Sequence, residues 1–156
     1  MNDQDFMRLA IDCARRGIRE GQTPFGACIV RDGAPAATEH NGVWTETDST
    51  AHAEIRAIRQ ACRALRTIDL SGCAIYSTCE PCPMCFAACH WARLDRIVFG
   101  ASIADAQAAG FHELTISNKV MKRLGGSGIE IVGGVLRDEA AALFREWRES
   151  GKARTY

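Results

Sequence analysis

The stretch TCEPCPMC, residues 78–85, places three cysteines and two prolines within eight positions. A disulfide, a redox pair and a metal site are three explanations for such a cluster of thiols. The chain has eight cysteines, and its first ten residues, MNDQDFMRLA, lack the apolar core of a secretory signal peptide. We therefore expect a cytoplasmic protein, in which a Cys-x-x-Cys pair indicates metal binding or redox chemistry rather than a structural disulfide.

Length and composition limit the class of protein. A chain of 156 residues suits one hydrophobic core, so we expect a single domain over 1–156 with a C-terminal tail over 150–156. Lysine plus arginine and aspartate plus glutamate number 19 each, so no net charge attracts the chain to nucleic acid or to an anionic membrane. No apolar run approaches the length of a transmembrane helix. Nucleic acid and membrane are therefore not expected partners, although a local basic patch stays open.

Hydrophobic periodicity on both sides of the cysteine cluster predicts alternating helices and strands. Two runs joined by the Asp32-Gly33 turn, over 25–41, predict a β-hairpin. Residues 101–128 carry no clear pattern. Because strands that alternate with helices require partly parallel pairing, we expect an α/β layer fold. The other predicted elements are helices over 5–21, 51–65, 83–94 and 137–151 and strands over 72–78, 95–102 and 128–134.

A second motif, His-Ala-Glu, lies 30 residues before the Cys-x-x-Cys pair. His52, Cys82 and Cys85 together offer one nitrogen and two sulfur ligands, a set that suits zinc. Three protein ligands leave the fourth tetrahedral position open, as in catalytic zinc sites. All three lie at predicted helix starts, where the helix dipole favours thiolate over thiol.

Glu54, two residues after His52, is predicted to act beside the metal rather than to bind it. Zinc makes water a nucleophile near neutral pH, and a neighbouring carboxylate can carry its proton to a substrate nitrogen. His-x-Glu followed by Pro-Cys-x-x-Cys is the general signature of zinc-dependent nucleobase deaminases.

Several other readings of these residues stay open. The Cys-x-x-Cys pair could be a redox pair, or Cys79 could complete a purely structural zinc site. The zinc site could also belong to a non-catalytic interaction module. The remaining cysteines are expected in the core. An arginine stripe on the helix over 51–65 could be a solvated face or a phosphate-contacting surface: Arg56, Arg59, Arg63 and Arg66.

The motifs TAHAEI (50–55) and CEPCPMC (79–85) resemble the cytidine deaminase superfamily of zinc hydrolases, and within it the bacterial guanine deaminase branch. Three further stretches carry the resemblance to that branch: PFGA at 24–27, HWAR at 90–93 and AGF at 109–111. It implies a three-layer α/β/α fold with a central mixed five-stranded sheet, one zinc per subunit and a homodimer. It also implies that the C-terminal tail crosses to the partner subunit and covers the pocket, although a frayed end is equally open.

The resemblance carries functional roles to individual residues of this chain. Zinc ligands would be His52, Cys82 and Cys85, and the catalytic residue would be Glu54. Aromatic side chains would stack on the base, and the amide of an asparagine would hydrogen-bond its edge. The substrate-binding residues implied in this way are Phe25, Asn41, Ala53, Trp91, Glu113 and Tyr156.

Two departures bear on the substrate. Glu113 stands where guanine deaminases of this type carry aspartate, and Ala87 stands where a glycine is usual. The extra methylene moves the carboxylate by more than about an ångström, a displacement that matters in catalysis. We expect hydrolytic deamination of a free base, guanine to xanthine and ammonia, in purine metabolism. Another aminopurine, cytosine, a pterin, an aminotriazine and the adenosine of tRNA stay open as substrates.

Overall fold

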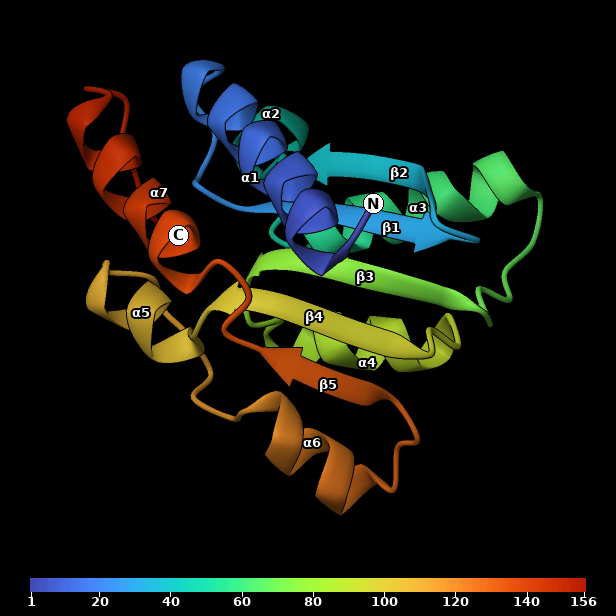
Figure 1. The fold of residues 1–156 in the computed structure, drawn as a ribbon. Coiled ribbons are helices and arrows are strands. Elements are labelled where there is room, and N and C mark those ends of the chain that lie inside the picture. Colours follow the sequence, from blue (N-terminus) through green and yellow to red (C-terminus); the bar gives the residue numbers. More distant parts are fainter.

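The computed structural model describes residues 1–156, which build a mixed five-stranded sheet in the order β2-β1-β3-β4-β5 (Figure 1). The pairs β1–β2 and β1–β3 are antiparallel, whereas β3–β4 and β4–β5 are parallel. The strands are β1 (Gly26–Arg31), β2 (Ala34–His40), β3 (Cys73–Cys79), β4 (Arg96–Ala101) and β5 (Glu130–Gly133).

Helices cover both faces of the sheet, so the predicted three-layer α/β/α fold is confirmed (Figure 1). One buried cluster joins the sheet to α1, α5 and α7, and the other joins it to α3 and α4. No helix is both long and apolar enough to span a bilayer. The helices are α1 (Asp3–Arg19), α2 (Val43–Glu46), α3 (Ala53–Leu65), α4 (Pro83–Trp91), α5 (Ile103–Ala108), α6 (Asn118–Gly125) and α7 (Arg137–Glu149).

The predicted hairpin and the predicted strands lie close to their expected ranges. Asp32 and Gly33 both have positive φ, 51° and 74°, as the tight turn between β1 and β2 requires. The unassigned stretch 101–128 contains α5 and α6, which the sequence pattern did not reveal because both helices are short. Short α2 was also not predicted, since four residues carry no readable periodicity.

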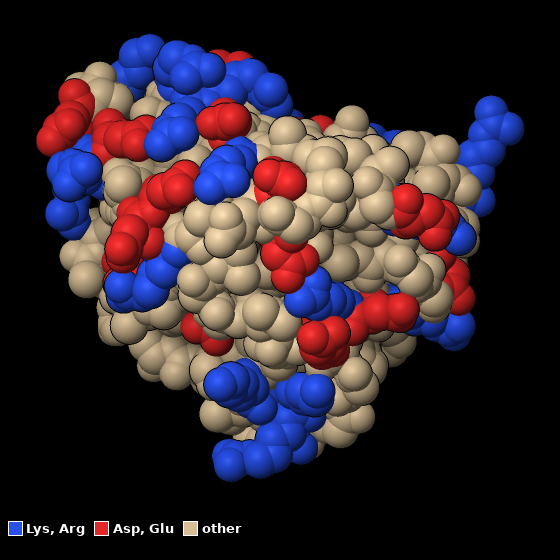
Figure 2. Space-filling view, in the orientation of Figure 1, with Lys and Arg blue, Asp and Glu red and all other residues tan.

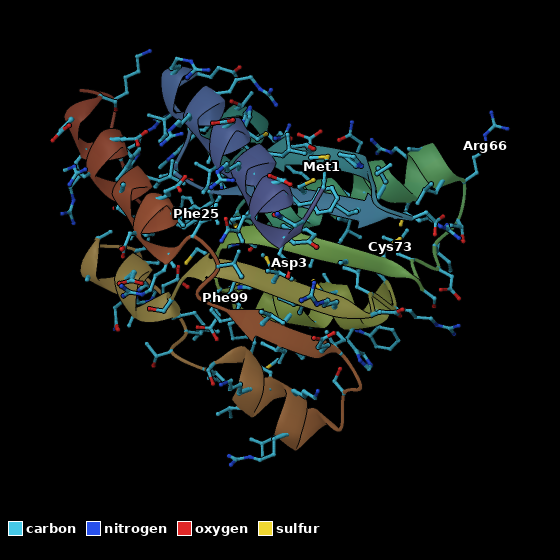
Figure 3. The ribbon with its side chains drawn as sticks, viewed as in Figure 1. Met1, Asp3, Phe25, Arg66, Cys73 and Phe99 are labelled. Carbon is cyan, nitrogen blue, oxygen red and sulfur yellow. The ribbon has the colours of Figure 1, made fainter.

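The start of α1 is tied to the sheet by a partly buried ion pair. Asp3 accepts hydrogen bonds from Arg96 of β4, at 2.8 and 2.9 Å, and from the Tyr76 hydroxyl of β3, at 2.8 Å. Hydrogen bonding to Arg96 lowers the pKa of Asp3 below its ordinary value. Figure 3 shows Asp3 at the end of α1 above these strands. The contact fixes α1 across the sheet.

Gly26 is the point of closest approach between α1 and β1. A Cβ built there would lie 2.2 Å from the Ala10 carbonyl oxygen and 2.9 Å from the Ala14 nitrogen. Both atoms belong to the helix backbone, which cannot move without shifting the helix. A glycine is therefore required at the first residue of β1, where the strand passes α1.

We predict that Gly26→Ala lowers the free energy of unfolding by about 3 kcal/mol, the upper part of the usual range for overpacked cores. Gly125→Ala is the matched control, because nothing lies within 4 Å of its Cβ and alanine favours a helix. Urea titration of both variants measures the difference. Equal stability of Gly26→Ala and wild type would contradict the close approach of α1 to β1.

Candidate active site

His52 and Cys82 occupy the N-cap positions of α3 and α4. N-cap side chains usually accept a hydrogen bond from the first turn, yet neither of these does. Pro83, at the first helical position of α4, has no N–H that needs a partner. Both side chains are thus free to point into the space between the two helix starts, and Cys85 follows in the first turn of α4.

The three candidate ligands converge on one point. The Nδ1 atom of His52 lies 3.6 Å from Cys82 Sγ and 3.5 Å from Cys85 Sγ, and the three ligand atoms lie within 4.8 Å of one another. Zinc bonds of ordinary length in a tetrahedral arrangement separate nitrogen and sulfur ligands by about 3.6 Å. The residues present therefore fit a zinc ion without rearrangement.

The electrostatics of the group favour a cation. A hydrogen bond from the Cys85 thiol, assisted by His52, lowers the pKa of Cys82 to about 4. The pKa of Cys85 is raised, because its thiol shares a proton with the Cys82 thiolate and because it is buried. A bound zinc ion deprotonates a coordinating thiol outright, so both sulfurs become ligands.

Glu54 lies in the first turn of α3, where it is buried beside the candidate ligands. Burial raises the pKa of this carboxyl above its ordinary value. The Ser77 hydroxyl donates a hydrogen bond to Glu54 Oε1 at 3.0 Å, and Oε2 lies 3.6 Å from Cys85 Sγ. A protonatable carboxyl thus stands at the edge of the metal site without belonging to the ligand group.

A small cavity opens beside the candidate ligands. The Phe25 ring forms part of its wall and packs edge-on against Phe111 and Phe144, with centroids 4.9 and 5.8 Å away. Besides two of the candidate ligands and Glu80, the lining residues are Phe25, Asn41, Glu54, Cys79, Glu113 and Tyr156.

Asn41 and Tyr156 meet across this cavity. Fully buried Asn41 uses its Oδ1 to accept a bond from the Val43 backbone N–H at 3.0 Å. Its Nδ2 donates to the Tyr156 hydroxyl oxygen at 2.7 Å. The Tyr156 ring lies 5.7 Å from the His52 ring and 5.6 Å from the Phe111 ring. In the single chain, the C-terminal residue therefore lies over the chain's own pocket.

The tail that carries Tyr156 is held at two further points. Lys152 Nζ donates to the Arg19 carbonyl at the end of α1, at 2.8 Å. The Arg154 guanidinium lies 3.9 Å from the centre of the Trp44 ring, a cation–π contact. The tail is thus a packed strap rather than a frayed end.

Glu113 also reaches the cavity. Burial, together with the negative charge of Cys82, raises the pKa of Glu113 to about 7. Glu113 follows α5 in a segment, residues 109–117, that is neither helix nor strand. The periodicity of the sequence therefore could not predict where its side chain points.

Two predicted substrate-binding residues do not line the pocket of the chain. Trp91 is 81% exposed, and it lies at the opposite end of α4 from Cys82. It lies six positions after Cys85, which is about 9 Å along a helix axis. Ala53 is fully buried, and its side chain packs in the core between α3 and the sheet. Helix direction turns both side chains away from the cavity of the same chain, and their roles in substrate binding stay predictions.

The thiol of Cys79 is not part of the ligand group. It donates to the Ser102 carbonyl at 3.3 Å, and the group that could hold a metal contains only His52, Cys82 and Cys85. The structure thus gives no support to a four-ligand structural site.

Sequence reasoning missed a brace behind the cysteine loop. Glu80 accepts hydrogen bonds from the backbone N–H groups of Ile103, at 3.3 Å, and Asn118, at 2.9 Å. The Asn118 side chain donates to the Pro81 carbonyl at 2.6 Å. The brace holds the loop before Cys82 against the starts of α5 and α6. Because its partners lie 23 to 38 residues apart, no local pattern could reveal it.

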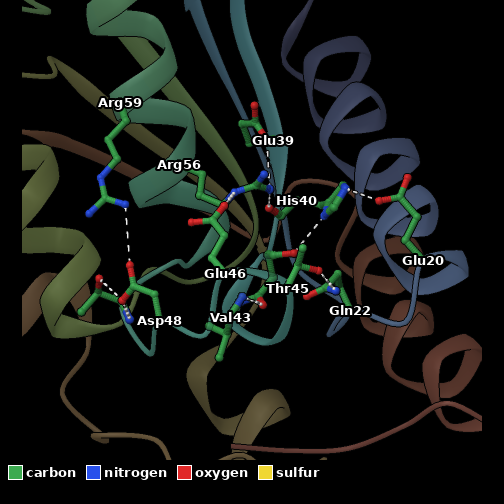
Figure 4. Close-up of polar contacts among 12 residues, drawn as sticks. Glu20, Gln22, Glu39, His40, Val43, Thr45, Glu46, Asp48, Arg56 and Arg59 are labelled. Carbon is green, nitrogen blue, oxygen red and sulfur yellow. Dashed lines mark hydrogen bonds and ion pairs between the residues drawn. The ribbon is translucent and has the colours of Figure 1, made fainter.

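The arginines of the stripe on α3 differ in their partners; Figure 4 shows those of Arg56 and Arg59. Arg56 lies 2.7 Å from Glu46 and 3.0 Å from Glu39, and it also donates to the His40 carbonyl. Arg59 approaches Asp48 only at 3.9 Å, and Arg63 and Arg66 make no ion pair. Arg56 therefore ties β2 and α2 to α3 next to Asn41, and it is not free to contact a phosphate.

We predict that Cys85→Ala, which removes a candidate ligand, lowers the zinc content of the purified chain from about one per chain to near zero. Cys79→Ala is the matched control and is expected to keep its zinc, because its thiol bonds a backbone carbonyl. Metal analysis by mass spectrometry measures both. Loss of zinc from Cys79→Ala, with retention in Cys85→Ala, would contradict this ligand set.

Comparison with known proteins agrees with this geometry. Residues 1–101 match the family model for the cytidine and deoxycytidylate deaminase zinc-binding region, so zinc is the metal of the His/Cys/Cys group. The guanine deaminase of Bacillus subtilis (strain 168) is 38% identical over 157 residues, 100% of both chains. The tRNA-specific adenosine deaminase of the same bacterium is 38% identical over 155 residues, 97% of this chain and 94% of that one.

Solved structures give the same relationship. A guanine deaminase from Nitrosomonas europaea superposes with a TM-score of 0.85 at 32% identity, over 94% of this chain and 84% of that one. A mutant protein in complex with 8-azaguanine superposes with a TM-score of 0.88 at 33% identity, over 95% of this chain and 85% of that one. With its sheet, its ligand group and these matches taken together, the chain belongs to the zinc-dependent cytidine and deoxycytidylate deaminase family.

Proposed function

We propose that the protein hydrolyses guanine to xanthine and ammonia, with His52, Cys82 and Cys85 as the zinc ligands and Glu54 as the catalytic acid/base. The observation that carries this proposal is the small cavity closed by Tyr156 over Phe25 and Asn41. An aromatic ring, an amide and a carboxylate in the lining suit a planar base, and closure by Tyr156 leaves little room for a ribose or a polynucleotide.

The proposed mechanism assigns each residue a separate task. Zinc, when bound by the three ligands, makes water nucleophilic near neutral pH. The Glu54 carboxylate takes one proton from the attacking water and passes it to the ring nitrogen beside the amino-bearing carbon, while the oxygen adds to that carbon. Glu54 then takes the second proton from the added hydroxyl and gives it to the amine, so that a carbonyl forms, the carbon–nitrogen bond breaks and ammonia leaves. Tyr156 excludes bulk water from the pocket during these steps.

Recognition of the base would use groups with complementary hydrogen-bonding capacity. The Phe25 ring offers a stacking face. The Asn41 amide can exchange its bond to Tyr156 for one to the base, while Oδ1 stays held by Val43. Glu113 faces the same cavity and can accept from a ring N–H or an amino group.

A second candidate is deamination of adenosine in tRNA, because the matched tRNA-specific enzyme has the same 38% identity as the matched guanine deaminase. Polyanionic RNA requires a basic surface, and the chain has no net charge. On the face shown in Figure 2, acidic and basic side chains are interspersed, although basic residues gather at the end of α1 and over α6. The charge distribution favours a free base.

Assembly and location form a further part of the proposal. We propose a homodimer, because Ile68 and Trp91 expose large apolar surfaces, 86% and 81% of each residue, on one side of the molecule.

All eight cysteines are free thiols, which agrees with a reducing location, so we propose that the protein is cytoplasmic. We also assign the whole of 1–156 to one domain, since the first and last helices pack on the same sheet face.

The decisive experiment is ammonia release from guanine, adenine, cytosine, guanosine and tRNA. We expect guanine to be the best substrate and Glu54→Gln to lose activity by about 10²–10⁴-fold while it keeps its zinc, because proton transfer passes through this carboxylate. Activity on tRNA with guanine inert would favour the second candidate. Turnover by Glu54→Gln at the wild-type rate would exclude the assigned mechanism.

Deleting residues 152–156 is predicted to lower kcat/KM for guanine by about tenfold or more, because the pocket loses its closure. Zinc content and the unfolding midpoint should change little, since the tail packs on the surface. Tyr156→Phe is the matched control: it keeps the ring but loses the bond from Asn41, so a smaller loss is expected. Steady-state kinetics compares the three proteins, and unchanged kinetics after deletion would remove Tyr156 from the pocket.

A further inference from the structure

Ser77 is a buried hydroxyl in the middle of an apolar strand. It is 2% exposed and lies on β3 two residues after Ile75, which belongs to the core between the sheet and α3 and α4. Because side chains alternate along a strand, Ser77 points to the same face as Ile75. A hydroxyl there is costly unless it has a hydrogen-bond partner.

That partner is Glu54. The Ser77 hydroxyl donates to Glu54 Oε1 at 3.0 Å across the boundary between β3 and α3. No lysine or arginine bonds to this carboxylate, and its other side-chain donor is the Cys85 thiol. Because a zinc-bound cysteine is a thiolate and donates no hydrogen bond, Ser77 is the side-chain donor that remains when zinc is bound. With Oε1 engaged by the sheet, Oε2 is left on the side of Cys85, at 3.6 Å from its sulfur.

The geometry points to Ser77 as the positioning residue of Glu54, an inference that rests on the proposed deaminase function. Its hydroxyl anchors one carboxylate oxygen to a central strand, and thereby directs the other oxygen toward the metal site and the cavity. Without the anchor, the carboxylate can rotate about its terminal bond, where broad torsional minima give little resistance. Misplacement by about an ångström is enough to slow proton transfer by about two orders of magnitude.

The test compares Ser77→Ala with Ser77→Thr, which keeps a donor. We expect Ser77→Ala to lower kcat for the preferred base about tenfold, with KM within about twofold and zinc content unchanged. Ser77→Thr should restore most of kcat. Thr78→Val is the control, because the adjacent buried hydroxyl accepts from the Gly26 N–H rather than bonding to Glu54. Wild-type kcat in Ser77→Ala, or an equal fall in kcat for Thr78→Val, would overturn the inference.

A stability measurement tests the same contact without any substrate. Urea titration of zinc-loaded protein should show that Ser77→Ala lowers the unfolding midpoint in the wild-type background. In a Glu54→Ala background it should leave the midpoint unchanged or raise it, because the hydroxyl has already lost its acceptor. Equal shifts in both backgrounds would overturn the Ser77–Glu54 link. If the wild-type protein released ammonia from none of the bases, the proposed function would fail. The stability comparison in the two backgrounds would still decide whether Ser77 bonds to Glu54.

Discussion

The meeting of two helix N-termini at one edge of the sheet is the constraint on which the active site depends. α3 and α4 both begin there, and each begins with a residue that leaves its own backbone uncapped: His52 and Cys82. Hydrogen bonds from Cys85 and His52 lower the pKa of Cys82 to about 4. The positive ends of the two helix dipoles also favour thiolate sulfur. Zinc ligation thus uses two N-cap positions whose side chains in other helices would bond to the first turn.

The mixed sheet brings the remaining pocket residues to the same edge. β3 runs parallel to β4, so both strands end beside the helix starts, and ligands in α/β folds bind outside such ends. β1 runs antiparallel to β3, so its first residues, next to Phe25, lie at this edge as well. β2 ends there with His40, which puts Asn41 directly into the cavity wall. Reversal of the hairpin would move both residues to the far edge.

Long-range polar contacts then hold this edge in place. Arg56 fastens the segment around Asn41 to α3, and Glu80 with Asn118 fastens the cysteine loop to α5 and α6 (Figure 4). The Ser77 hydroxyl of the central strand β3 donates to Glu54 of α3. The metal ligands are thus surrounded by hydrogen bonds to backbone and side chains, the arrangement that orients ligands in metal sites generally.

The sequence by itself determined the parts that depend on short-range spacing. His-x-Glu and Cys-x-x-Cys are read directly from the chain, and strand alternation and the Asp32-Gly33 turn predict most of the sheet. Those features follow from backbone geometry over a few residues. Ser77 left a faint signal, a hydroxyl residue in the apolar run AIYST, but its partner Glu54 lies 23 residues away.

Only the tertiary structure decided which of the other candidates face the cavity. Trp91 and Phe25 are both aromatic residues beside conspicuous motifs, yet the direction of α4 carries one away while the start of β1 brings the other in. Tyr156 reaches Asn41 across 115 residues because the strap after α7 folds back over the sheet edge. Such contacts join segments remote along the chain, and local propensity carries no information about which remote segments will meet.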